Sequence, residues 1–313
     1  MTSSETLQSS TGAALNLYRW QAPGKPHAIV QINHGLAEHA ARYARFGQFL
    51  AARGFNAYAH DHRGHGLTKA PDAPLGSFGP RGGGAVVADV LAVRDRIEAD
   101  HPGVPVILFG HSMGGLVTLN TLVRHSSRFA ATAIWNANFT GGPTGLAAQS
   151  ILAWERFRLG SDVPSRLLPR LTFGTWAKKV RGGRTRFDWL SRDTAEVDAY
   201  IADPLCGWEA SVGMWQTVFG FAAAGTQDDS FARIRRDMPV NLVGGAEDPA
   251  TDGGKAVTRL ADRMRRLGFS NLVSTVYPQT RHESLNELNR NLIMEHFADW
   301  AARAVPQPTQ AAT

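Results

Sequence analysis

Short apolar runs rich in β-branched residues recur along the chain, and most are followed by a segment whose apolar positions have helical spacing. Strands are expected at residues 14–20, 27–35, 55–61, 104–110, 129–137, 238–248 and 272–278. Helices are expected at residues 41–54, 83–102, 113–126, 253–267 and 284–304. Apolar strands that alternate with helices are typical of a mostly parallel sheet with helices on both faces, so the predicted fold class is α/β.

The alternation stops after residue 137 and resumes at about residue 233. Prolines, helical segments and tryptophans replace buried strands in this stretch, which holds five of the eight tryptophans. A segment that interrupts a sheet and returns to it is expected to form an inserted subdomain. The predicted organisation is a core in two parts, residues 1–137 and 233–305, with a helical lid over 138–232 and a flexible tail over 306–313.

Composition indicates a globular protein, because 43% of the 313 residues are hydrophobic and 19% are charged. The net charge of +6 comes from scattered basic residues, so no nucleic-acid partner is expected. The exception is a basic group formed by Lys178, Lys179, Arg181, Arg184 and Arg186. It is interpreted as a solvated surface, with an anionic lipid surface or anionic substrate as the alternative.

A cytoplasmic location is expected from three further features. The start of the chain has no signal-peptide pattern, and no apolar run is long enough to span a membrane. The single cysteine, Cys206, forms no intrachain disulfide, and it is interpreted as a packing residue of the predicted lid rather than a nucleophile.

Ser112 is the candidate nucleophile. It lies in the sequence FGHSMGG, residues 109–115, whose G-x-S-x-G pattern is weak by itself in a chain with 32 glycines. Here the pattern directly follows an expected strand and opens an expected helix. That context is the one a nucleophile elbow requires, since the sharp turn lifts the serine above the sheet.

A serine nucleophile needs a histidine base and an acid that orients it, in the chain order Ser, Asp or Glu, His. His282 follows the expected strand 272–278 and is the candidate base, whereas His296 lies within a helix and is interpreted as structural. Asp248 is the favoured acid because it lies in the turn after a strand. Glu247 is its nearest rival, and Asp252 is an alternative that also suits a helix cap.

Ester cleavage also needs donors for the oxyanion, and backbone amides suffice. The amide of Met113 directly follows the candidate nucleophile at the start of a helix. A second donor is expected from a loop after an early strand, and the sequence NHGLAEH, residues 33–39, makes the amide of Leu36 the candidate.

Five segments, HGLAEHAARY, AHDHRGHGLT, GHSMGG, GGAEDP and RHESLNE, resemble in order and spacing a branch of the α/β-hydrolase fold. This is the monoacylglycerol lipase and lysophospholipase branch, also grouped with serine aminopeptidase-like hydrolases, and the resemblance covers residues 13–305. It implies the triad Ser112, Asp248 and His282, the oxyanion amides of Leu36 and Met113, and a lid over residues 138–232.

The resemblance also implies an activity, the hydrolysis of a lipid-type ester through an acyl-enzyme, without a cofactor or metal. The expected partners are a small-molecule or lipid ester and, transiently, a membrane surface touched by the lid. His60, Asp61, His62 and His65 are accordingly interpreted as a structural turn beside the active site rather than a metal cluster.

Two alternative functions remain open from the residues alone. An aminopeptidase or amidase has the same triad, and acidic residues lining the lid favour it because they hold a substrate amine. A ligand receptor with a slow, vestigial triad is the other alternative. A serine at the elbow argues against epoxide hydrolase chemistry, which uses aspartate there.

Overall fold

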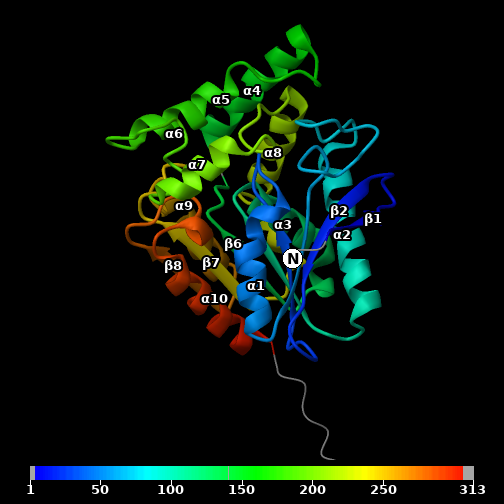
Figure 1. Ribbon diagram of the computed structural model, residues 1–313. Coiled ribbons are helices and arrows are strands. Elements are labelled where there is room, and N and C mark those ends of the chain that lie inside the picture. Colours follow the sequence, from blue (N-terminus) through cyan, green and yellow to red (C-terminus); the bar gives the residue numbers. More distant parts are fainter. Residues whose placement is uncertain (1–3, 140, 306–313) are drawn as a thin grey trace, which may run out of the picture.

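The computed structural model describes residues 4–139 and 141–305. Within this part of the chain, eight strands form one sheet in the order β1-β2-β4-β3-β5-β6-β7-β8 (Figure 1). The strands are β1 (Ser4–Gln8), β2 (Ala14–Trp20), β3 (Ile29–Asn33), β4 (Asn56–His60), β5 (Val106–His111), β6 (Ala131–Trp135), β7 (Val240–Gly245) and β8 (Leu272–Tyr277). Strands β3 to β8 are parallel, and β1 and β2 are antiparallel to their neighbours.

The α/β prediction is confirmed, with one strand added. Strand β1 was not expected because its sequence, SETLQ, is polar. It lies at the edge of the sheet, pairs with β2, and alternates between exposed and half-buried residues, so it needs no apolar run.

Helices cover both faces of this sheet (Figure 1). They are α1 (Ala44–Ala52), α2 (Gly82–Asp100), α3 (Met113–His125), α4 (Gly142–Leu159), α5 (Leu168–Leu171), α6 (Phe173–Lys179), α7 (Thr194–Ala202), α8 (Val212–Ala224), α9 (Lys255–Arg266) and α10 (Arg290–Ala304). One buried apolar cluster joins the sheet to α2, α3 and α9, and a second joins it to α1 and α10. In the described chain, no helix has the length and apolar character needed to cross a bilayer.

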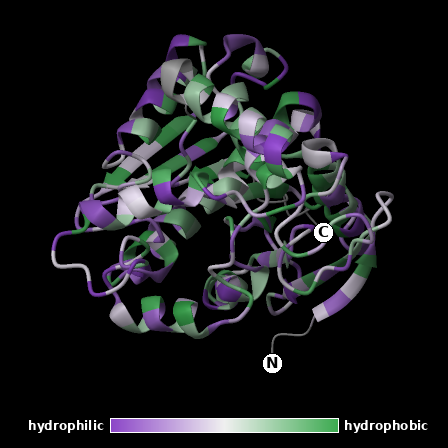
Figure 2. Ribbon diagram, turned by 90° about the horizontal axis from the view of Figure 1, so that it is seen from above, coloured by the Kyte–Doolittle hydropathy of each residue, from purple (hydrophilic) through white to green (hydrophobic). Residues whose placement is uncertain are grey.

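The central strands supply both apolar clusters because their side chains alternate between the two faces. In β5, Leu108 packs in the cluster with α2 and α3, whereas its neighbour Phe109 packs in the cluster with α1 and α10. Figure 2 shows hydrophobic residues concentrated on the strands within the molecule. The continuous apolar runs of the sequence are thus strands buried on both faces.

The last helix starts later than expected. Residues 284–286 form a short 3-10 turn, and α10 begins at Arg290. This stretch does not continue α10, because its side chains form hydrogen bonds with the core. The Ser284 hydroxyl donates to Asn136 Oδ1 at 2.8 Å. The Glu287 carboxylate accepts from the amide of Arg281 at 3.0 Å.

Helices α4 to α8 lie between β6 and β7 in the sequence and at one end of the sheet in space (Figure 1). Helix α8 packs against α2, α3 and α4, and its Met214 and Trp215 belong to the apolar cluster that contains α3. Residues 138–232, the inserted segment, therefore share a core with the sheet. Their role as a lid stays a prediction, and the expected tail over 306–313 lies outside the described residues.

The DHRGHG sequence forms a buried turn organised by Asp61. Its carboxylate accepts hydrogen bonds from the amide of Ala40 at 2.8 Å, the amide of Leu67 at 2.8 Å and the Asn16 side chain at 2.9 Å. The turn thereby joins the loop before α1 to strand β2.

Four buried histidine rings pack together at this turn. The His34 and His62 ring centroids lie 4.5 Å apart, and those of His60 and His62 lie 4.7 Å apart. Burial lowers the pKa of His60 to about 4 and the pKa of His34 and His65 to about 3. All four rings are therefore uncharged near neutral pH.

We expect this cluster to make the fold sensitive to acid. The His60 pKa is about 4 in the folded chain and ordinarily 6.5, so between these pH values only the unfolded chain takes up the proton and stability falls as pH falls. Replacing His60 by Leu should reduce the slope of unfolding free energy against pH by up to about 1.4 kcal/mol per pH unit. Urea unfolding across this range measures the slope.

The matched control is His27→Leu, because His27 is exposed and solvent reaches its ring in both states. It should leave the slope unchanged. If the slope of unfolding free energy against pH is identical for His60→Leu and the parent protein, His60 does not cause the sensitivity to acid.

Candidate active site

Ser112 lies on a strained turn between β5 and α3. Its φ of 54° and ψ of −120° are unusual for a residue with a side chain. The flanking glycines are required by close approach, since a Cβ on Gly110 would lie 2.1 Å from the Gly114 oxygen and one on Gly114 would lie 2.0 Å from the Asn33 oxygen. The G-x-S-x-G pattern here has the backbone geometry that a nucleophile elbow requires.

The turn places Ser112 beside His282, which comes from the loop after β8. Ser112 Oγ lies 2.8 Å from His282 Nε2. On the other side of the ring, His282 Nδ1 lies 3.0 Å from each carboxylate oxygen of Asp248. Because an ionised carboxylate only accepts, Nδ1 carries the proton and Nε2 is free to accept from the serine hydroxyl.

Asp248 is fully buried and follows β7. Burial acts to raise the pKa of this carboxyl, but the His282 ring and hydrogen bonds from Asn136 and Thr251 outweigh burial and hold the pKa below its usual value. The Asn136 amide donates at 3.1 Å and the Thr251 hydroxyl donates at 2.8 Å. The carboxylate is thus ionised and fixed in place.

The rival residues lie elsewhere. Glu247 is exposed, and Asp252 is exposed and forms an ion pair with Lys255 at 3.5 Å. His296 Nδ1 lies 2.9 Å from the Tyr277 hydroxyl, away from Ser112. Among these acids and histidines, the structure brings Asp248 and His282 together with the serine.

The two residues whose amides are the predicted oxyanion donors line the same cavity as Ser112. Leu36 and Met113 both line it, and the loop before Leu36 comes so close that a Cβ on Gly35 would lie 3.4 Å from the Ser112 Cβ. Within the described chain, neither amide donates to another protein group. Two free donors therefore flank the serine, one of them at the N-terminus of α3.

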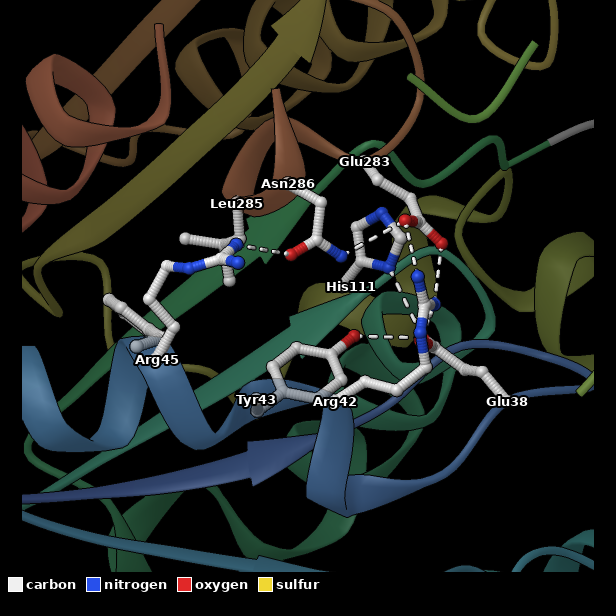
Figure 3. A pocket seen from close by; sticks show the side chains of 9 residues that line it. Glu38, Arg42, Tyr43, Arg45, His111, Glu283, Leu285 and Asn286 are labelled. Atoms are coloured by element: carbon white, nitrogen blue, oxygen red, sulfur yellow. Dashed lines mark hydrogen bonds and ion pairs between the residues drawn. The ribbon is translucent and has the colours of Figure 1, made fainter. Parts of the chain in front are cut away.

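Arg42 holds together the loops that carry these groups (Figure 3). Its guanidinium donates to Glu38 at 2.6 Å and to both oxygens of Glu283 at 2.6 and 2.7 Å. Glu38 lies two residues after Leu36, and Glu283 directly follows His282. We call Glu38, Arg42 and Glu283 the Arg42 clamp.

The clamp extends toward the triad through His111 (Figure 3). His111 Nδ1 lies 3.6 Å from Glu38, and His111 Nε2 donates to the His282 carbonyl at 3.0 Å. Burial disfavours a charged ring, but Glu38 outweighs burial and raises the pKa of His111. Glu38 also accepts from the amide of Gly35 at 2.5 Å, so the clamp supports both sides of the serine.

Sequence reasoning did not identify these supporting residues. Glu38 and Arg42 do have the i,i+4 spacing of a local ion pair. Glu283 is 241 residues from Arg42, so no local pattern relates them. His111 occupies a variable position of the elbow pattern and carries no signal of its own.

Ser112 and His282 open into a cavity of about 760 Å³. Its wall is mainly apolar and comes from α4, α5, α6 and α8 of the inserted segment. Four of the five tryptophans in this segment line it: Trp176, Trp189, Trp208 and Trp215. The tryptophans of the inserted segment thus form much of the apolar cavity wall.

Cys206 is partly buried beside Tyr200 and Trp189, as expected for a packing residue. Burial raises the pKa of its thiol. The thiolate form is therefore disfavoured, which argues against a nucleophilic role.

The sequence profile of the family described as serine aminopeptidase, S33, matches residues 24–289. The chain belongs to this family. Monoglyceride lipase from Homo sapiens is 31% identical over 199 residues, which are 64% of this chain and 59% of that protein. Monoglyceride lipase from Rattus norvegicus is 28% identical over 312 residues, which are 96% of this chain and 93% of that protein.

Solved structures show the same fold. A carboxyl esterase from Bacillus coagulans, in complex with glycerol, superposes with a TM-score of 0.87 over 98% of this chain and all of that chain, at 21% identity. This S33 family member therefore has an α/β-hydrolase fold. Ser112, Asp248 and His282 follow the parallel strands β5, β7 and β8, so they lie at the same end of the sheet.

Removing the Arg42 charge should destabilise the protein strongly. Arg42→Met leaves two buried carboxylates without a counterion, which costs about 3–5 kcal/mol. Arg45→Ala is the matched control, since Arg45 is 43% exposed in its ion pair with Glu196 and such a pair contributes at most about 1 kcal/mol. Equal losses of unfolding free energy in urea for the two variants would show that the clamp has no special role.

Proposed function

We propose that this protein hydrolyses carboxylic esters of lipid type, monoacylglycerols or lysophospholipids, through an acyl-enzyme on Ser112. The observation that carries the proposal is the hydrogen-bonded series Ser112, His282 and Asp248, which opens into an apolar cavity of about 760 Å³. The monoglyceride lipases among the relatives support the substrate class.

In the acylation step, His282 Nε2 removes the hydroxyl proton as Ser112 Oγ attacks the ester carbonyl. The 2.8 Å separation of these two atoms suits this transfer. Asp248 holds the Nδ1–H tautomer and stabilises the imidazolium that forms. The amides of Leu36 and Met113 stabilise the oxyanion, and the alcohol leaves with the proton from His282.

Deacylation repeats the sequence with water as the nucleophile. His282 takes a proton from water as its oxygen attacks the acyl carbon, and returns that proton to Ser112 Oγ when the acid leaves. The chemistry is complete with these side chains and amides, so the proposal includes no cofactor or metal. The inserted segment acts as the lid that shields the acyl-enzyme, since its helices form the cavity wall.

The charges of the cavity wall favour esters over peptides. An aminopeptidase holds the substrate amine with an unpaired carboxylate. In the described lining, Glu38 and Glu283 share Arg42, and Asp252 pairs with Lys255. No carboxylate in this lining is left for a free amine.

Helix α4 supports transient contact with a lipid surface. It exposes Leu146, Trp154 and Phe157 by 65%, 50% and 91%, while Ile151 on the same helix lines the cavity. The Arg158 guanidinium stacks on the Trp154 ring at 4.8 Å. Aromatic residues next to arginine are typical of a helix that lies at a membrane interface, and here the same helix borders the cavity for the substrate.

Turnover of p-nitrophenyl esters and monoacylglycerols, assayed beside aminoacyl arylamides, tests the activity. We expect the esters to react faster and Ser112→Ala to abolish turnover. Asp248→Asn should lower kcat by about four orders of magnitude, because the neutral amide no longer selects the productive tautomer. Glu247→Gln is the matched control and should retain activity. Faster arylamide cleavage would favour the aminopeptidase alternative, and absence of turnover would favour the receptor.

Vesicles test the membrane contact. Trp154→Ser/Phe157→Ser should reduce hydrolysis of monoacylglycerol in vesicles by at least about tenfold, because full burial of one large apolar side chain contributes about 1.5–3 kcal/mol. Turnover of a soluble p-nitrophenyl ester should not change. Leu292→Ser, on an exposed position of α10, is the control. An equal loss on both substrates, or no loss on vesicles, would exclude the contact.

A further inference from the structure

Two cations without partners lie in the wall of the substrate cavity. Lys179 is the last residue of α6, and Arg259 lies on α9. Both line the cavity that contains Ser112, and both are exposed at its mouth. In the described chain, neither side chain forms an ion pair or hydrogen bond.

Other charges of the cavity do not neutralise this pair. Among the described lining residues, the carboxylates of Glu38 and Glu283 are bound to Arg42, and Asp252 is bound to Lys255. The mouth therefore carries two positive charges that are free to bind an anion from the substrate.

Helix α6 connects Lys179 to the proposed reacting atoms. Trp176 lies one helical turn before it on α6, and the Trp176 ring centroid is 6.3 Å from that of His282. Residues three apart on a helix lie about 5–6 Å apart. Lys179 is thus one turn away from the residue that packs against the proposed base.

Most of the apolar wall comes from helices that carry neither cation. Arg259 belongs to α9, whose N-terminal turn follows Asp248, whereas α4, α5 and α8 supply most of the apolar wall. In Figure 1, α6 and α9 lie to the left of α8. An ester at Ser112 can therefore place its acyl chain against the apolar wall and its alcohol portion toward the cations.

A second cavity of about 340 Å³ adjoins this mouth. The two cavities share Lys179, Pro249 and Asp252, and the second is also lined by Arg181 and Arg281. Lys179 and Arg181 are members of the basic group noted in the sequence. The carboxylates of Glu247 and Asp248 also line the second cavity, so space for a head group larger than glycerol continues beyond the mouth between basic and acidic side chains.

We propose that Lys179 and Arg259 bind the phosphate of an anionic lysophospholipid whose ester lies at Ser112. The inference rests on the proposed ester hydrolysis and selects one substrate class within it. Phosphate suits the site because one group offers several acceptor oxygens and up to two negative charges to two separate cations. A neutral monoacylglycerol leaves both cations solvated.

The kinetic test compares octanoylglycerol with octanoylglycerol phosphate, both as monomers in solution so that no lipid surface takes part. We expect kcat/KM to be higher for the phosphate ester. Lys179→Ala/Arg259→Ala should lower this preference roughly three- to tenfold at low ionic strength, because the variant loses more rate on the phosphate ester than on octanoylglycerol. Added salt should reduce the preference of the parent protein.

Lys178→Ala/Arg266→Ala is the matched control. Both residues are exposed, lie on the same two helices, and do not line the cavity, so the variant loses the same net charge. It should keep the preference. An equal loss in the control would show a long-range charge effect, and no loss in the Lys179→Ala/Arg259→Ala variant would show that these cations do not bind substrate. Either result overturns the inference and leaves ester hydrolysis intact.

Binding to a Ser112→Ala protein tests the same site without turnover. Octanoylglycerol phosphate should bind more tightly than octanoylglycerol, and the difference should disappear with Lys179→Ala/Arg259→Ala. Glycerol phosphate, which lacks the acyl chain, should bind at least tenfold more weakly. If it binds equally well, the site accepts free phosphate esters and the inference is wrong. If the phosphate preference in binding holds but the parent protein cleaves no ester, the proposed activity fails separately.

Discussion

One buried guanidinium determines how the loops around Ser112 are arranged. Arg42 bonds to Glu38 on the loop that carries Leu36 and to Glu283 on the loop that carries His282. Neither loop belongs to the sheet, so strand pairing does not fix their separation. The ion pairs fix this separation, because each buried carboxylate is stable only while the guanidinium stays between them.

The loop that bears Leu36 is also tied to the inserted segment. The Ala37 carbonyl accepts from the Tyr200 hydroxyl and from the Gly207 amide, each at 2.9 Å. His39 Nε2 lies 2.8 Å from Asp203. The stretch around α7 is therefore anchored to the loop that carries Leu36.

The sheet could be predicted because its central strands are buried on both faces, which makes each a continuous apolar run. Ser112 was predicted from its glycines, and Asp248 and His282 from their order after two such strands, and the structure brings these three side chains together. Strand β1 was missed because an edge strand can be polar. Glu283 and Arg42 meet across 241 residues, and His111 meets the His282 carbonyl across 171 residues. Both depend on tertiary contacts that no local pattern encodes.

The backbone conformation of Ser112 lowers the stability of the fold but supports the proposed activity. Its φ of 54° stores strain of about 1–3 kcal/mol, held by the packing of Gly110 and Gly114 around it. Glycine would adopt this conformation with less strain but offers no nucleophile. Selection for a more stable chain therefore tends to remove the serine, and its presence here means that the strain is retained in exchange for a hydroxyl held above the sheet.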